Sequence, residues 1–195
     1  MYWALLIVVA VIAVLVVVGY NKLIAMKGQT MNAWKQIDVQ LKRRHDLIPN
    51  LVSAVKGAME FEKDTLEAVI QARNQAVKVQ ANASPTGGIA ALAQAEATLG
   101  AALSRLNVVV ERYPALKATA NVGQLQEELT STENRVAFSR QLYNDTATEY
   151  NVTQQQIPWN FIAPLAKAQV VELWEIEAAA EREAPKVDLS MKPKA

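Results

Sequence analysis

A long apolar segment begins the chain, and amphipathic segments with helical spacing follow it. Residues 2–18 contain no charged or strongly polar side chain. As a helix rising about 1.5 Å per residue, the chain up to Tyr20 would span roughly 30 Å, the thickness of a bilayer's hydrocarbon core. A cleaved signal peptide is the alternative, but no Lys or Arg precedes the segment, which is longer than a signal peptide's usual apolar region. We therefore predict a retained transmembrane anchor over residues 1–20.

The following segments carry apolar side chains at three- and four-residue spacing, which is typical of helices with one buried face. Residues 82–88 combine Pro with Gly-Gly and predict a loop, and Tyr113-Pro114 interrupts the next helix. The expected helices cover residues 21–45, 47–80, 89–112 and 116–156. Such helices favour an all-α fold, in which a single transmembrane helix is followed by a long antiparallel four-helix bundle over residues 21–157.

The junction between the first two of these helices lies at Asp46 and Pro49. Proline is tolerated in the first turn of a helix, and an Asp just before that turn is a good N-cap. The pattern therefore predicts a helix–turn–helix corner, with a kinked continuous helix as the alternative. Arg44 falls on the apolar face of the first helix. We expect it to pair with Asp46 or with a Glu of the fourth helix.

The C-terminal part begins with a Pro- and Trp-containing turn. Residues 158–184 are expected to form this turn and then an acidic amphipathic helix over residues 165–183, followed by a polar tail over residues 185–195. One stripe of the predicted helix contains Val170, Val171 and Trp174. This stripe is a candidate contact for a partner's groove. The alternative is that the helix packs on its own bundle or on a neighbouring copy.

Charge is balanced overall but not along the chain. The total of 20 Lys and Arg against 19 Asp and Glu gives +1, so no global nucleic-acid signal exists, whereas residues 20–45 alone carry +5. The positive-inside rule then places the bundle in the cytoplasm and the N-terminus outside. Aromatic and basic residues flanking the apolar segment are candidates for the membrane interface: Trp3, Tyr20, Lys22 and Lys27. Two further basic residues are candidate contacts for a neighbouring copy: Lys42 and Arg43.

No catalytic, metal or cofactor site is predicted. The chain has no Cys and one His, and His45 lacks the Glu three residues earlier that a di-iron helix pair uses. We expect His45 to be a surface or corner residue. Tyr143-Asn144 and Tyr150-Asn151 lie on one helix face, and we expect core tyrosines whose hydroxyl groups find polar partners.

An ordered set of motifs runs from residue 20 to residue 163: Tyr20-Asn21, the sequence of residues 33–57, Ala72-Arg73, ERYPALKA at 111–118, LQEEL at 125–129, ENR at 133–135, Tyr143-Asn144-Asp145, Tyr150-Asn151 and Pro158-x-Asn-x-Ile-Ala163. This set resembles the bacterial LemA family, with its MamQ-like relatives. The resemblance implies one N-terminal membrane helix carrying an antiparallel bundle, and no defined catalytic residue. The chain departs from the family pattern after Ala163, where Pro164 and the acidic segment replace the usual ending.

Two functions are expected from these features. The first is a non-enzymatic scaffold, anchored in the bacterial inner membrane, that forms homo-oligomers and organises or remodels the bilayer. The alternative is an adaptor that presents a membrane partner. The resemblance associates this alternative with a metalloprotease of the HtpX type.

Overall fold

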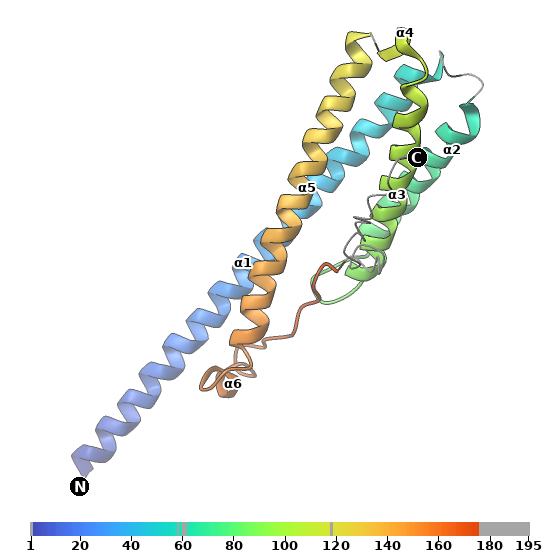
Figure 1. Ribbon diagram of the computed structural model, residues 1–195. Coiled ribbons are helices and arrows are strands. Elements are labelled where there is room, and N and C mark those ends of the chain that lie inside the picture. The colour runs from blue at the N-terminus through green and yellow to red at the C-terminus, as the bar shows by residue number, and fades with distance from the viewer. Residues whose placement is uncertain (1, 58, 60–61, 118, 176–195) are drawn as a thin grey trace, which may run out of the picture.

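The computed structural model describes residues 2–57, 59, 62–117 and 119–175. Every named element in these ranges is a helix, so the all-α prediction is confirmed. The elements are α1 (Tyr2–Lys56), α2 (Lys63–Gln80), α3 (Ile89–Val110), α4 (Pro114–Lys117), α5 (Ala120–Thr153) and α6 (Trp159–Ile162). Figure 1 shows α1 as a long rod whose N-terminal part projects beyond the other helices.

The predicted corner at Asp46 and Pro49 is wrong. Helix α1 continues for 55 residues with Pro49 inside it, and Asp46 is an exposed mid-helix residue rather than an N-cap. The first turn of the body comes instead after Lys56. Continuity through the proline is favoured by burial, because Ile48, Leu51 and Val55 remain on the buried face of α1. Local sequence signals favour the corner over the continuous helix, but contacts with other helices stabilise the continuous helix.

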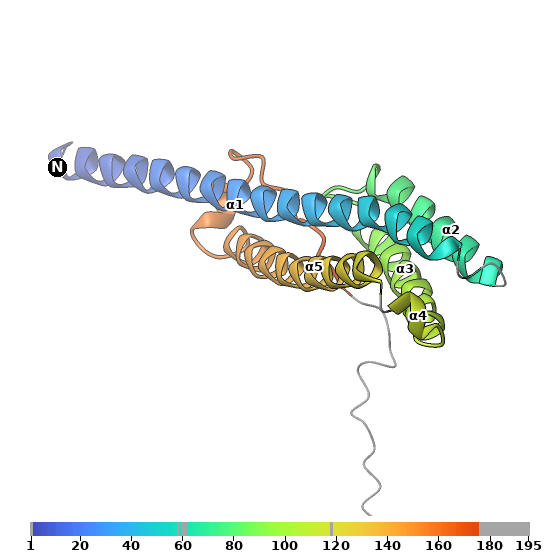
Figure 2. The ribbon, with the colours of Figure 1, turned by 90° about the horizontal axis from the view of Figure 1, so that it is seen from above.

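The body has two halves with different construction. The distal half, farther from residue 2, packs the end of α1 against α2, α3 and the start of α5 around one core cluster. The proximal half pairs α1 with α5 along a second cluster that contains Trp34, Ile37, Tyr143 and Tyr150. Figure 2 shows α5 beside α1, with α2 and α3 displaced toward the far end of the body.

An extended segment completes the proximal half. Residues 163–167 form turns after α6, and residues 168–175, here called the strap, contain no helix. The predicted helix over residues 165–183 is therefore wrong for residues 165–175, and residues 176–183 lie outside the described ranges. Val171 and Trp174 of the strap join the core cluster of α1 and α5. The strap thus covers part of the core between α1 and α5.

Candidate functional site

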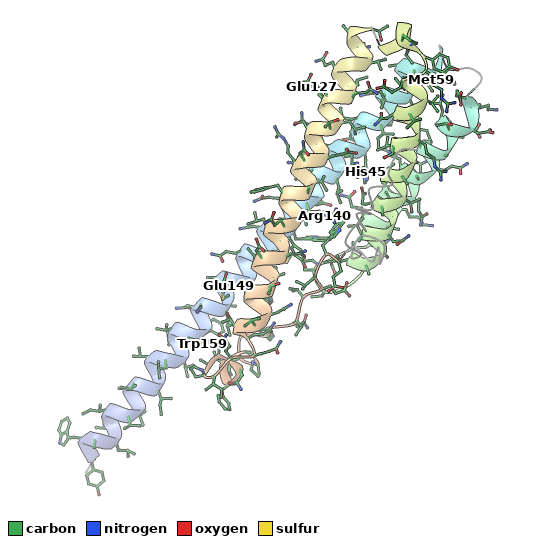
Figure 3. All side chains as sticks on the ribbon, viewed as in Figure 1. His45, Met59, Glu127, Arg140, Glu149 and Trp159 are labelled. Carbon is green, nitrogen blue, oxygen red and sulfur yellow. The ribbon has the colours of Figure 1, made fainter. Side chains whose placement is uncertain are left out.

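A buried ion cluster joins three helices where the two halves of the body meet. Arg44 of α1 donates from one terminal nitrogen to Glu96 of α3 and from the other to Glu133 of α5, both at 3.0 Å. His45 Nε2 lies 2.7 Å from the second carboxylate oxygen of Glu96. His45, which Figure 3 labels, is buried together with Arg44 and Glu96, so the expectation of a surface His45 is wrong, whereas Glu133 is exposed.

The cluster confirms one of the two pairings expected for Arg44. Its partner on α5 is Glu133, a glutamate of the predicted fourth helix, whereas Glu96 was not anticipated. Removing a buried charge's partner is costly, because the remaining charge stays out of water. The arrangement therefore fixes the relative positions of α1, α3 and α5. The carboxylates of Glu96 and Glu133 are bound by Arg44, and Glu96 also contacts His45.

A cavity of about 320 Å³ lies beside this cluster. It is bounded by Arg44, Glu96, Glu133, Arg140 and Trp174. The Arg140 guanidinium lies 5.0 Å from the centre of the Trp174 ring, so a cation–π contact closes one side. Across the described residues, no group of three or more acidic or His side chains is arranged to hold a metal ion.

Arg73 of α2 explains how α1 continues through Pro49. Proline lacks the N–H that would bind the carbonyl four residues earlier, so the His45 carbonyl has no partner within the helix. Arg73 Nε donates to that oxygen at 3.1 Å. A side chain from another helix therefore supplies the donor that Pro49 lacks, and the same residue ties α2 to α1.

Two asparagines of α5 hold the strap. The Asn151 side chain binds both the N–H and the C=O of Val171, at 3.0 and 2.8 Å. Asn144 binds the same two groups of Trp174, at 2.8 and 3.0 Å. Seven helical residues rise about 10 Å, and three extended residues span about 10 Å. The distance between Asn144 and Asn151 along α5 therefore matches the distance between Trp174 and Val171 along the strap. The two asparagines hold the strap antiparallel to α5.

Tyr143 and Glu172 connect the strap to the core and to α3. The Tyr143 hydroxyl donates to the Glu172 carbonyl at 2.7 Å, as expected for a core tyrosine. Burial, and then the Glu172 carboxylate, raise the pKa of Tyr143 far above its usual value. That carboxylate accepts from the N–H of Ile89 at 3.1 Å, at the first residue of α3. Because Gly88 has no side chain to cap the helix, Glu172 provides the cap from the strap.

Helix α6 packs against α1 just after the apolar segment. A Cβ added at Gly19 would lie 2.5 Å from both Ile162 and the Trp159 ring, so only glycine permits this approach. Lys22 Nζ lies 5.4 Å from the centre of the same ring. Leu23 and Ile162 are buried together in a small separate cluster. Trp159 lies at the end of the body from which α1 projects (Figure 3).

The remaining predicted site residues lie in different environments. Lys42, Arg43 and Val170 are exposed. Val171 and Trp174 are buried in the chain's own core, with 8% and 4% of their surface exposed, which corrects their assignment to an accessible stripe. The physical reason is that the side chains of Asn144 and Asn151 bind the backbone N–H and C=O groups of Trp174 and Val171, which in a helix would bind other backbone groups. Four residues were expected at the membrane interface, and all are exposed: Trp3, Tyr20, Lys22 and Lys27.

Sequence reasoning missed several residues of these contacts: Gly19, Arg73, Glu96, Asn144, Asn151, Trp159 and Glu172. Three signals were available in the sequence. The Tyr-Asn pair repeats after seven residues, which places both amides on one face of a helix. A proline within a helical pattern implies an unpaired carbonyl four residues earlier. A glycine at the end of an apolar segment permits close approach of another element.

Comparisons with known proteins place the chain in a family. The model of the LemA family matches residues 33–189, so the chain belongs to the LemA family. Magnetosome protein MamQ 2 of Paramagnetospirillum magneticum is 26% identical, covering 89% of this chain and 71% of the relative. MamQ of Magnetospirillum gryphiswaldense is 25% identical, covering 83% and 66%. Protein LemA of Metamycoplasma hominis is 25% identical, covering 87% and 72%. Together with the apolar α1, these relatives define a membrane-associated helical protein.

Proposed function

We propose that this protein is a non-enzymatic scaffold, anchored by α1 in the bacterial inner membrane, which self-assembles and organises or remodels the bilayer. The observation that carries the proposal is the continuity of α1. The same 55-residue helix supplies the exposed apolar segment and the first helix of the bundle. A helix without a flexible joint couples the orientation of the body to that of the membrane segment. Three of the matched relatives carry the name magnetosome protein, which supports a role at a membrane.

The outer face of α1 and α5 is the surface where we place contacts between copies. A groove of about 420 Å³ runs between these helices, lined on α5 by Ser131, Asn134, Arg135, Phe138 and Ser139. Phe138 is 67% exposed, and Val39 on the adjoining part of α1 is 60% exposed. Single-span proteins in one membrane share an orientation, so their bundles meet side by side. Arg43 lies seven residues after the groove residue Gln36 and therefore on the same side of α1.

The charge arrangement supports the orientation with the bundle in the cytoplasm. The net charge of +5 over residues 20–45 follows the apolar segment directly, and residues 1–19 of the sequence contain no charged side chain. The adaptor alternative depended on an accessible stripe at residues 170–174. Because Val171 and Trp174 are buried, the described residues favour the scaffold over the adaptor.

Self-assembly is tested on the full chain in mild detergent by light scattering over a range of concentrations. We expect particles larger than one copy, with a mass that increases with protein concentration. Phe138→Glu should shift the distribution toward single copies, because it places a charge in the apolar contact. The matched control is Val108→Glu, which changes a similarly exposed residue of α3 outside the groove. A single copy at every concentration would reject self-assembly.

A further inference from the structure

We propose that residues 157–165, here called the α6 loop, form a second membrane contact. Their exposed apolar side chains would enter the boundary between headgroups and acyl chains, in the leaflet from which α1 emerges. The proposal rests on α1 crossing the membrane, which is part of the proposed function. It adds a lipid-binding element that is separate from the span, on a different part of the chain.

The position of the loop along α1 is the first argument. Trp159 and Ile162 touch Gly19, directly after the exposed apolar residues 2–18. A residue of α1 changes height by only about 1.5 Å per position, so this contact holds the loop level with the end of the apolar segment. If the apolar segment of α1 crosses the bilayer, the contact at Gly19 places the loop at the membrane surface.

The division of side chains within the loop is the second argument. Ile162 and Ala163 of the loop, and the adjoining Ala166, are buried against Leu23. The other side of the loop carries Ile157, Phe161 and Leu165, which are 79%, 72% and 64% exposed. Burying a side chain of this size is worth about 1.5–3 kcal/mol. Leaving three such side chains exposed to water is costly, whereas the acyl boundary beside α1 provides an apolar environment.

The charge around the loop is the third argument. From Tyr150 to Val171 the chain has no carboxylate, and Lys167 is its one charged residue. On α1, no carboxylate occurs before Asp38. Lys22 lies over the Trp159 ring and Lys167 is exposed, so ammonium groups accompany the apolar side chains. Exposed apolar residues flanked by lysines suit an anionic lipid surface, which attracts each basic residue near it.

Lipid is favoured over a second protein because the loop is continuous with the apolar surface of α1. A segment with one apolar and one polar side can lie in the interface plane with its apolar side chains at the boundary between headgroups and acyl chains. Attachment at both α1 and the α6 loop would restrict rotation of the body about α1. It would therefore present the same face of every copy to its neighbours.

The proposal is tested with labels attached to single cysteines, because the chain contains no native Cys. Three full-length variants, Phe161→Cys, Val9→Cys and Val108→Cys, replace exposed side chains on the α6 loop, the apolar segment and the distal part of α3. Each carries an environment-sensitive fluorophore in nanodiscs of equal parts phosphatidylcholine and phosphatidylglycerol, which leave both membrane faces accessible. Quenching by a nitroxide near the top of the acyl chain is compared with quenching by iodide in water.

We expect the labels at positions 161 and 9 to be quenched several-fold more by the lipid nitroxide than by iodide, and the label at position 108 to show the reverse. A label at 161 that is quenched like the one at 108 would overturn the proposal. So would a label at 161 that is shielded from both quenchers, because that result indicates a second copy. If the label at 9 is also in water, the anchor fails together with the loop; if it is in lipid, only the loop contact is rejected.

Discussion

The side-chain amide of Asn144 binds both the N–H and the C=O of Trp174, at 2.8 and 3.0 Å. Asparagine thus pairs with an extended residue as the neighbouring strand of a sheet would, although it stands on a helix. The second pair, Asn151 with Val171, repeats the arrangement three residues earlier in the strap. The two asparagines make four hydrogen bonds between α5 and the strap, and the Tyr143 hydroxyl of α5 adds another.

Loss of one clamp should release the strap. Asn144→Ala leaves the N–H and C=O of Trp174 without their partners, which should lower the free energy of unfolding by about 2 kcal/mol, at about 1 kcal/mol per hydrogen bond. The control is Asn134→Ala, an exposed asparagine on the same helix, which should change it by less than about 0.5 kcal/mol.

Amide hydrogen exchange provides the local measurement for this pair of variants. The amides of Val171 and Trp174 should be protected in the native chain and should exchange faster in Asn144→Ala, with no change in Asn134→Ala. Equal protection in all three proteins would show that the asparagines do not hold the strap.

Pro49 and Arg73 should be energetically coupled. In the native chain, Arg73→Met removes the donor to the His45 carbonyl and should cost about 1–2 kcal/mol. In a Pro49→Ala background the new N–H of residue 49 can bind that carbonyl, so the same change should cost less than about 0.5 kcal/mol. Chemical unfolding of the four proteins in detergent measures the coupling. An equal cost in both backgrounds contradicts the account, and Arg105→Met serves as an exposed control on α3.

Because of the ion cluster, Arg44 should contribute more to the free energy of unfolding than the neighbouring Arg43. Arg44→Met leaves Glu133 unpaired and removes one of the two partners of Glu96, with an expected loss of about 3 kcal/mol in unfolding free energy. Arg43→Met, at the next position but exposed, should change it by less than about 0.5 kcal/mol. Similar small losses for both variants would mean that the cluster contributes little to stability.

Stability should fall at high pH because of Tyr143. Burial raises the pKa of Tyr143 in the folded state, whereas an unfolded tyrosine loses its proton near pH 10. Above that pH the unfolded state alone releases the proton, so unfolding becomes easier by about 1.4 kcal/mol per pH unit. Tyr143→Phe removes the hydrogen bond to the Glu172 carbonyl, so its free energy of unfolding should be about 1 kcal/mol lower at neutral pH. Above pH 10 its free energy of unfolding should decline less steeply than that of the native chain. Unfolding of both proteins between pH 8 and 11.5 measures this, and parallel curves would contradict it.

The helical periodicity of the sequence was sufficient to predict the class of fold and much of the helix layout. Helix α3 begins at Ile89, as expected, and the Tyr113-Pro114 break separates it from α4. Apolar residues that follow the three- and four-residue spacing, such as Ile37 and Leu99, are buried. These features depend on local signals, which a single sequence contains.

The failures occur where distant residues decide the local conformation. Asp46 and Pro49 have the local pattern of a new helix, but Arg73 supplies the donor that keeps α1 continuous. Val171 and Trp174 are three residues apart, a spacing that places both on one face of a helix, so the local pattern favours a helix over the extended strap. The asparagines that select the strap lie 20 and 30 residues earlier in the chain, beyond any local pattern.

The most direct test of the scaffold is electron cryo-tomography of the full chain reconstituted in vesicles of bacterial lipid composition. The account predicts clusters of bundles that stand on the membrane side by side, with changed bilayer curvature beneath them, and fewer clusters for Phe138→Glu than for Val108→Glu. Isolated single copies on undisturbed bilayers at every protein-to-lipid ratio would contradict it.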